Sequence, residues 1–84
     1  MSSIDVYAIK SKTAEILRTF RDLLTVSELK INKMSISNNE IIVEGEYKSK
    51  ALFTSEIIEE GTFKIIFDKQ LNPKNVSIMP SPKG

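Results

Sequence analysis

The sequence predicts a two-layer α+β domain, in which one N-terminal amphipathic helix packs on an antiparallel meander of three to four strands. Three observations predict this fold class. Apolar residues recur with helical spacing up to about residue 24, the period then changes to 2, and turn-forming residues separate the later segments. We expect one domain over residues 1–79, because a chain of 84 residues supports a single core.

The N-terminal helix is predicted over about residues 4–24. Its apolar stripe consists of Val6, Ile9, Ile16, Phe20 and Leu23, widened by Leu17 and Leu24. Ser2 or Ser3 is the expected N-cap, and Ser11 or Thr13 offers a second start. Because residues 4–8 also alternate as a strand would, the first turn and a half stays open between the two conformations.

A β-hairpin is predicted to follow the helix. Leu29 and Ile31 alternate with polar residues, but the alternation then resumes one step out of phase, which indicates a bulge near Lys33. Asn38-Asn39 predicts the turn, since asparagine tolerates positive φ better than most residues. The second strand is then expected over residues 40–50.

The alternation in this second strand separates a core face from a largely polar face. The expected core residues are Ile41, Val43, Gly45 and Tyr47. We expect the missing side chain of Gly45 to let the helix approach the sheet closely. The other face of the sheet is predicted to stay partly open.

The C-terminal part of the chain predicts two more strands. Residues 62–69 place Phe63, Ile65 and Phe67 on one face, and the turn at residues 72–75 leads into a short strand over residues 76–79. Residues 80–84 hold two prolines and no other apolar residue, so we expect a disordered tail.

Residues 51–61 are compatible with two structures, a short helix ended by Gly61 or a wide hairpin loop. The segment carries four large apolar side chains, Leu52, Phe53, Ile57 and Ile58. Such side chains either pack under the sheet or contact another molecule. They are the residues that we predict to bind a partner.

The composition excludes several classes of function. The chain has no cysteine and no histidine, which removes disulfides, thiolate zinc sites, thiol nucleophiles and the commonest general base. We predict no catalytic site, no cofactor and no metal site, because no activated nucleophile with an orienting partner can be named. From the N-terminal residues given and from the apolar runs we expect no targeting segment and no membrane-spanning stretch, and therefore a cytoplasmic protein without a small-molecule substrate.

Two groups of carboxylates are candidate cation or partner sites. Glu44 and Glu46 lie two residues apart on one strand face, and Glu56, Glu59 and Glu60 surround the isoleucine pair of the linker. A solvated strand face with lysines pairing across strands is the favoured interpretation of the first group. A solubilising linker is favoured for the second.

Basic residues of the helix and first hairpin give an alternative function, association with nucleic acid. The residues concerned are Lys10, Lys12, Arg18, Arg21, Lys30 and Lys33. Acidic residues are interspersed with them, and 12 basic against 11 acidic residues leave a net charge of only +1. A mixed solvated surface is therefore favoured over a phosphate-binding patch.

The predicted order of elements is similar to that of small gas vesicle accessory proteins and of the α-β-β-β units in PepSY-type domains. The pattern is closest at Thr62-Phe63-Lys64-Ile65-Ile66-Phe67-Asp68. This resemblance concerns topology, which does not carry function. The small core, the half-covered sheet and the apolar linker favour a non-enzymatic protein-interaction module, self-associating as a homodimer or acting as an accessory subunit.

Overall fold

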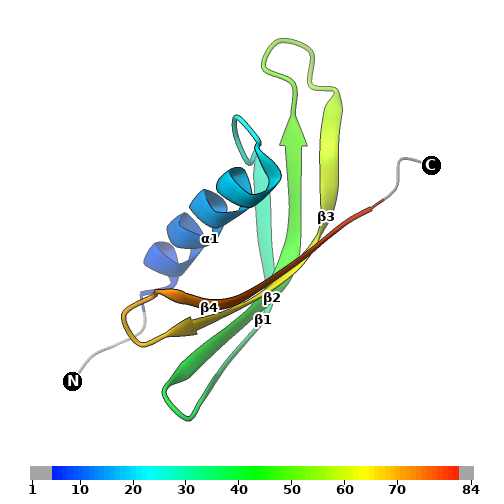
Figure 1. The fold of residues 1–84 in the computed structure, drawn as a ribbon. Helices are drawn as coiled ribbons and strands as arrows, with labels where there is room; N and C mark the ends of the chain where they lie inside the picture. Colours follow the sequence, from blue (N-terminus) through cyan, green and yellow to red (C-terminus); the bar gives the residue numbers. More distant parts are fainter. Residues whose placement is uncertain (1–4, 82–84) are drawn as a thin grey trace.

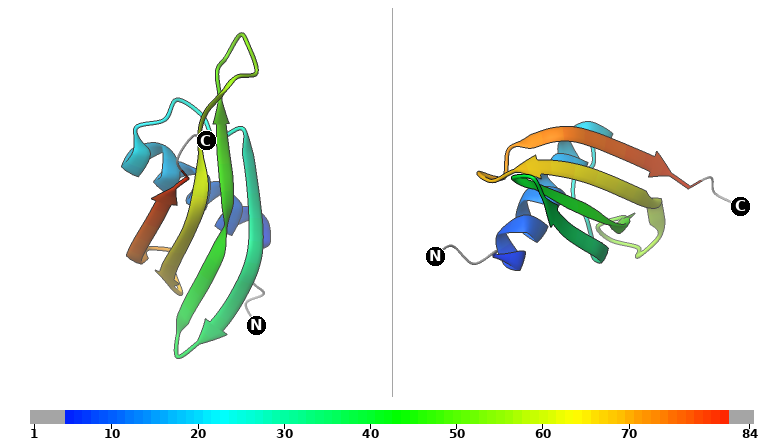
Figure 2. Two further views of the ribbon diagram at one scale, coloured as in Figure 1. Left: turned by 90° about the vertical axis from the view of Figure 1, so that its right-hand side faces the viewer. Right: turned by 90° about the horizontal axis from the view of Figure 1, so that it is seen from below.

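The computed structural model describes residues 5–81, which form one helix and four strands. Their order is α1 (Val6–Arg21), β1 (Glu28–Ser37), β2 (Glu40–Lys50), β3 (Ile57–Asp68) and β4 (Pro73–Pro80). The strands form one antiparallel sheet in the order β1-β2-β3-β4 (Figure 1). The sheet curves around α1, which lies on its concave side (Figure 2). The predicted α+β fold class is confirmed.

The helix is shorter than predicted and has a different N-cap. The Asp5 carboxylate accepts hydrogen bonds from the backbone N–H groups of Tyr7 at 3.0 Å and Ala8 at 3.2 Å, so Asp5 is the cap. Ser2, Ser3 and Ile4 lie outside the described residues. At the other end Asp22 takes a left-handed conformation with φ 53° and ends the helix.

The core lies between α1 and the concave face of the sheet. The buried hydrophobic residues are Ile9, Ile16, Leu17, Ile41, Val43, Tyr47, Phe63, Ile65 and Phe67. Alternate residues of β2 and β3 contribute most of them, as the period of 2 predicted. Thr13 is fully buried in the middle of α1, so it is not a second helix start.

The first hairpin has the predicted bulge and turn. The register of β1 against β2 shifts between Ile31 and Lys33. Asn38 and Asn39 join the two strands with φ values of 46° and 66°. Two consecutive positive φ values are those of the type I′ turn, whose twist matches that of the flanking strands.

Gly45 makes its close contact with the neighbouring strands and not with the helix, which corrects the prediction. A Cβ atom at this position would lie 2.0 Å from the carbonyl oxygen of Lys30 and 2.9 Å from the ring of Phe63. Gly45 pairs with Ile31 beside the bulge. The bulge brings the β1 backbone over this position, and only glycine leaves space for it.

Residues 51–61 belong to a long hairpin, so the alternative of a short helix was wrong. β3 begins at Ile57, five residues before the predicted start, and Gly61 is buried within it opposite Tyr47. The remaining loop is closed by the Ala51 N–H, which donates to the Glu56 carbonyl at 2.8 Å. Pairing with β2 satisfies backbone groups that an isolated short helix would leave unpaired.

The last strand extends beyond the predicted residues at both ends. The turn before it is held by the Asp68 carboxylate, which accepts hydrogen bonds from the N–H groups of Gln70 and Asn72, both at 2.9 Å. Pro80 belongs to β4, and the Ser81 N–H donates to the Glu60 carbonyl at 2.8 Å. The tail predicted for residues 80–84 therefore does not begin at Pro80, and residues 82–84 lie outside the described residues.

Candidate functional site

An exposed apolar cluster lies at the far end of the β2–β3 hairpin, which extends beyond the body of the molecule (Figure 1). This cluster, the apolar tip, consists of Leu52, Phe53, Ile57 and Ile58. Phe53 is 95% exposed and Leu52 is 67% exposed, and both lie in the turn itself. At the base of the turn Ile58 is exposed and Ile57 is half-buried. Leu52 and Phe53 are thus not core residues.

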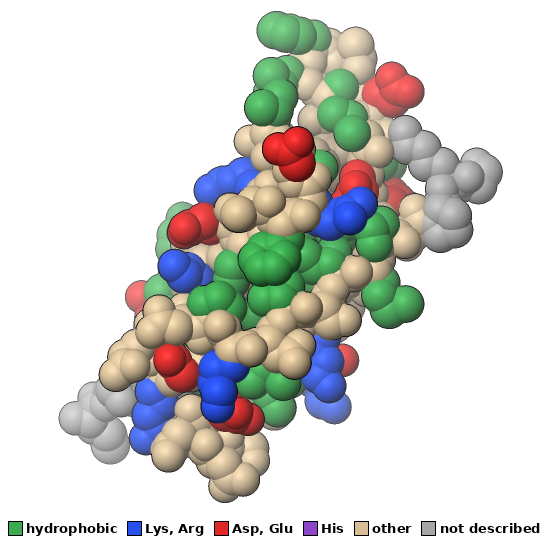
Figure 3. All heavy atoms as spheres, viewed as in Figure 1, with side chains coloured by type: hydrophobic (Ala, Val, Ile, Leu, Met, Phe, Trp, Pro, Cys, Tyr) green, Lys and Arg blue, Asp and Glu red, His purple; other side chains and the backbone are tan. Residues whose placement is uncertain are grey.

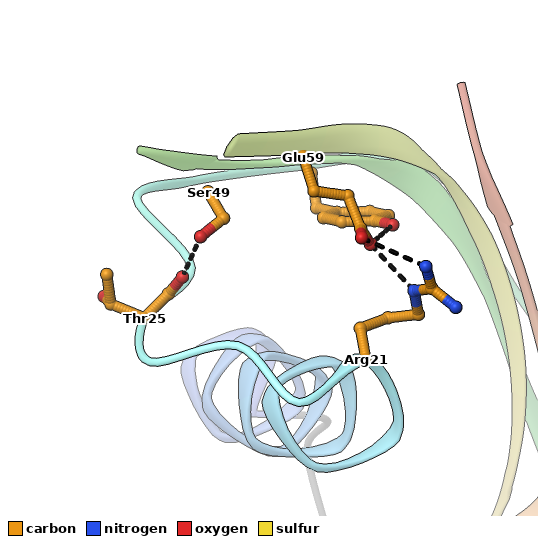
Figure 4. A network of polar contacts seen from close by, with 5 residues as sticks. Arg21, Thr25, Ser49 and Glu59 are labelled. Atoms are coloured by element: carbon orange, nitrogen blue, oxygen red, sulfur yellow. Dashed lines mark hydrogen bonds and ion pairs between the residues drawn. The ribbon is translucent and has the colours of Figure 1, made fainter. Parts of the chain in front are cut away.

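A polar network fixes the base of this hairpin to the end of the helix (Figure 4). The Arg21 guanidinium donates two hydrogen bonds to the Glu59 carboxylate, from Nε at 2.8 Å and from Nη2 at 3.0 Å. The buried Tyr47 hydroxyl donates to the same carboxylate. A two-pronged arginine contact fixes orientation as well as distance, so β3 is held in a defined position against α1.

The connection between α1 and β1 supports the same end of β2. The Ser49 hydroxyl donates to the Thr25 carbonyl at 2.7 Å (Figure 4), and the Lys50 N–H donates to the Ser27 hydroxyl at 3.0 Å. Ser49 is buried, so its hydroxyl requires such a partner. The hairpin therefore leaves the body from a base that is hydrogen-bonded on its helix side.

The electrostatics of the network favour one set of protonation states. Hydrogen bonding from Arg21 lowers the pKa of Glu59, and burial raises the pKa of Tyr47 to about 12, assisted by its hydrogen bond to Glu59. The same ion pair raises the pKa of Arg21. The carboxylate is accordingly charged and the phenol neutral at pH 7, as the observed hydrogen bonds require.

The glutamates considered around the linker do not form one acidic surface. Glu59 points to the helix side, where its side chain is 17% exposed and paired with Arg21. Glu60 pairs in register with Lys48, which lies on the opposite face of the sheet. Neighbouring residues of a strand point to opposite faces of the sheet, so Glu59 and Glu60 lie on different faces.

Glu44 and Glu46 lie on the convex face of the sheet, which α1 does not cover. Glu44 is flanked in register by Lys33 and Lys64, while Glu46 accepts a hydrogen bond from the Asn32 amide at 3.0 Å. Within residues 5–81 no group of three or more acidic side chains is placed to hold a metal ion. The arrangement is that of a solvated strand face with alternating charges.

The basic residues of the nucleic-acid alternative are spread over two layers. Lys30 and Lys33 pair in register with Glu46 and Glu44 on the convex face, whereas the basic residues of α1 lie on the other side of the sheet. In α1, Arg21 is bound to Glu59. The structure thus does not bring these side chains together into one phosphate-binding surface.

Sequence reasoning missed the network that positions the hairpin. The sequence predicts a basic helix face for Arg21 and a solvated linker for Glu59. One signal in the sequence points to Glu59. Alternate residues of a strand share a face, so Glu59 lies on the same face as Gly61 and the core residue Phe63 if the strand begins early enough to include it. Its partner could not be found in this way, because 38 residues separate the two in the chain.

No protein-family model matches the sequence, and neither the curated proteins nor the solved structures that were compared include a similar protein. The resemblance in topology noted from the sequence is not accompanied by a family match. Among residues 5–81 there is no helix of the length and apolar character needed to cross a membrane.

Proposed function

We propose that this chain is a small, non-enzymatic protein-interaction module that binds another protein through the apolar tip. The exposure of Phe53 carries the proposal, because this residue is 95% exposed in the turn of a projecting hairpin. A large aromatic side chain in this position contributes nothing to the core. Aromatic residues are enriched among the side chains that dominate binding energy at protein interfaces.

The support at the base of the hairpin favours this function. Binding costs free energy when flexible segments must be ordered, and a site that is already held in place reduces this cost. Arg21 and Ser27 hold the hairpin from the helix side through Glu59 and Lys50. A short turn that carries Leu52 and Phe53 on a fixed base can enter a concave apolar pocket of a partner with little reorganisation.

The surroundings of the apolar tip also match the anatomy of an interface. Thr54 and Ser55 lie within the turn, and Glu56 follows them as an exposed charge. An aromatic centre with a polar rim is the usual composition of a protein-binding patch. The expected partner therefore offers an apolar pocket and a rim with hydrogen-bonding groups.

The experiment compares three immobilised forms of the protein in an extract of the source cells. The forms are the wild type, a Leu52→Ser and Phe53→Ser double variant, and an Ile36→Ser control. Ile36 is also an exposed hydrophobic residue, at 58%, but it lies at the end of the β1–β2 hairpin. Quantitative mass spectrometry reads the bound proteins, and circular dichroism verifies the fold of each form.

We expect one specific partner to be recovered with the wild type and the control, and to be reduced at least about tenfold with the double variant. Recovery of this partner should persist after nuclease treatment. It should also persist in high salt, because salt weakens an apolar contact little. Equal recovery with the double variant would refute the role of the apolar tip. Recovery that disappears on nuclease treatment would favour the nucleic-acid alternative.

A further inference from the structure

Strand β4 forms one edge of the sheet, and its free side can be identified from its register. The Ser81 N–H donates to the Glu60 carbonyl, and Met79 and Ser77 pair with Thr62 and Lys64. In an antiparallel ladder, residues alternate between those that exchange hydrogen bonds with the neighbouring strand and those that do not. The backbone groups of Val76 and Ile78 therefore point away from β3, and no strand within residues 5–81 lies opposite them.

The position of Pro80 agrees with this assignment. Pro80 follows Ile78 by two residues, so its nitrogen also points away from β3. Proline has no N–H to donate and is tolerated in a sheet only where that side of the strand is free. Pro73 and Pro80 bound the strand, which leaves residues 74–79 to accept an additional strand through their backbone.

The middle of the β4 edge lacks charges and prolines, two of the features that normally prevent strand addition, whereas Pro73, Pro80 and a register shift are confined to its ends. Residues 75–79 read Asn-Val-Ser-Ile-Met and contain no charge and no proline. The flanking Lys74 is paired with Glu40 of its own chain at 2.6 Å. The opposite edge, β1, carries Lys30, Lys33 and a bulge, all of which discourage pairing.

An apolar surface lies beside this edge on the helix side of the sheet. Figure 3 shows hydrophobic side chains gathered between α1 and β4. Phe20 lies four residues after Ile16 and continues the buried stripe of α1, yet it is 59% exposed. Val76 and Ile78 pack against the core but are only partly buried. A strand beside β4 would cover this surface while satisfying the free backbone groups.

We propose that a second copy of this chain occupies the β4 edge, with the two β4 strands antiparallel about a two-fold axis at Ser77. Val76 then exchanges both backbone hydrogen bonds with the partner's Ile78, and Asn75 lies opposite the partner's Met79. Apolar β-branched side chains meet on the helix side, and no charge faces a like charge. The two sheets continue into one.

The strand itself favours a second copy over an unrelated peptide as the occupant. An antiparallel two-fold contact brings the same segment together from both sides, so it must be complementary to itself. Residues 75–79 meet this condition because they are neutral and their two β-branched residues, Val76 and Ile78, lie symmetrically about Ser77. The contact is distinct from the apolar tip, so a dimer would present two tips to a partner.

Single cysteines test the axis directly, because the chain has no cysteine of its own. At the axis the two copies of residue 77 form a pair without mutual hydrogen bonds, with Cα atoms about 4.5 Å apart, within the range that a disulfide spans. Ser77→Cys should give a covalent dimer under mild oxidation. Asn75→Cys and Met79→Cys are the matched controls, since each would lie roughly 13 Å from its own copy.

Solution mass provides a second, independent readout. Light scattering should give twice the monomer mass of 9.5 kDa for the wild type. Ser77→Lys should raise the dissociation constant about tenfold or more, because it places two ammonium groups opposite each other. Thr62→Lys adds the same charge on an exposed position of β3, one strand inward, and should leave the dimer intact.

Two results would overturn the proposal. One is a monomeric mass for the wild type at every concentration, and the other is a yield of covalent dimer that is equal at the three cysteine positions. The Leu52→Ser and Phe53→Ser double variant should dimerise like the wild type. The two proposals can therefore fail separately. A wild-type protein that dimerises but recovers no partner would contradict only the role of the apolar tip. A monomeric wild type that still recovers a partner would contradict only the β4 dimer.

Discussion

Glu59 shows how a single ionisable residue connects the helix to the sheet. Its carboxylate accepts hydrogen bonds from Arg21 and from the buried Tyr47 hydroxyl. Charged groups hydrogen-bonded in this way contribute to stability, but removing one partner leaves the others without compensation. The stability of the fold should therefore depend on the protonation state of Glu59.

We predict that acidification destabilises the wild type partly through Glu59. Its pKa in the folded protein lies below the unfolded value of 4.5. The contribution of the ionised Glu59 carboxylate to the free energy of unfolding is therefore fully present above about pH 4.5. It is lost as the pH falls through the pKa of Glu59 in the folded protein. Glu59→Gln should lower the free energy of unfolding at pH 7 by about 1–3 kcal/mol and flatten this acid dependence.

Urea unfolding followed by circular dichroism at a series of pH values measures both effects. Glu56→Gln is the matched control, because Glu56 is an exposed glutamate of the same hairpin. An acid dependence that is identical in Glu59→Gln and the wild type would contradict the assignment.

Thr13 is a second residue whose local environment gives a prediction. Its side chain is fully buried within α1, and its hydroxyl oxygen has no hydrogen-bond partner among residues 5–81. A buried polar group without a partner costs about 1–3 kcal/mol, and valine has nearly the same shape. Thr13→Val should therefore raise the free energy of unfolding by about 1 kcal/mol or more, measured by urea titration. Thr19→Val, at an exposed position of the same helix, should leave it nearly unchanged.

At the scale of secondary-structure elements, the bulge in β1 and the glycine in β2 depend on each other. The register shift between Ile31 and Lys33 lies beside Gly45, where an added Cβ would meet the Lys30 carbonyl oxygen. The contact is with backbone, which cannot move aside as a flexible side chain can. This pairing holds β1 in the phase that places Leu29 and Met34 on the same face.

We expect Gly45→Ala to destabilise the protein by about 3 kcal/mol or more, because the overlap can be relieved only by displacing β1. Thermal unfolding followed by circular dichroism gives the comparison. Thr62→Ala, at an exposed position of β3, is the control and should cost less than about 1 kcal/mol. A Gly45→Ala protein as stable as the control would show that β1 is not fixed by this contact.

At the scale of the whole molecule, the long hairpin gives the protein an elongated shape. The principal extents are 44 × 21 × 20 Å, and the apolar tip lies at one end (Figure 1). The core is concentrated under α1, so the turn at residues 51–56 receives no support from it. This separation leaves the turn free to contact a partner without disturbing the fold.

Limited proteolysis with chymotrypsin should therefore cut first after Phe53. Phe63, Phe67 and Tyr47 are buried in strands, and Tyr7 and Phe20 are exposed but belong to the helix, whereas proteases require an extended and accessible backbone. Mass spectrometry of early fragments identifies the site, and Phe53→Ser should slow the first cut. Initial cleavage at Phe20 or within the core strands would contradict this view of the turn.

The candidate site was partly predictable. Large apolar residues in a short connecting segment indicate partner binding for Leu52 and Phe53, but their exposure depends on where the segment lies. The sequence of residues 51–61 is compatible with helix and hairpin, since Gly61 can end a helix or occupy a strand. Pairing of residues 57–61 with β2 decided between them, and that pairing is a contact between distant residues.

Elements whose information is local can be predicted from the amino-acid sequence. The helical stripe that includes Ile9 and Ile16, the change of phase near Lys33 and the Asn38-Asn39 turn each follow from side-chain periodicity or from φ preference within a few residues. Tertiary structure alone decided the pairing of Arg21 with Glu59 and the free edge of β4. Both depend on which segments lie side by side in the folded chain. The free energy of such contacts between distant residues exceeds the local preference of a segment for helix or strand.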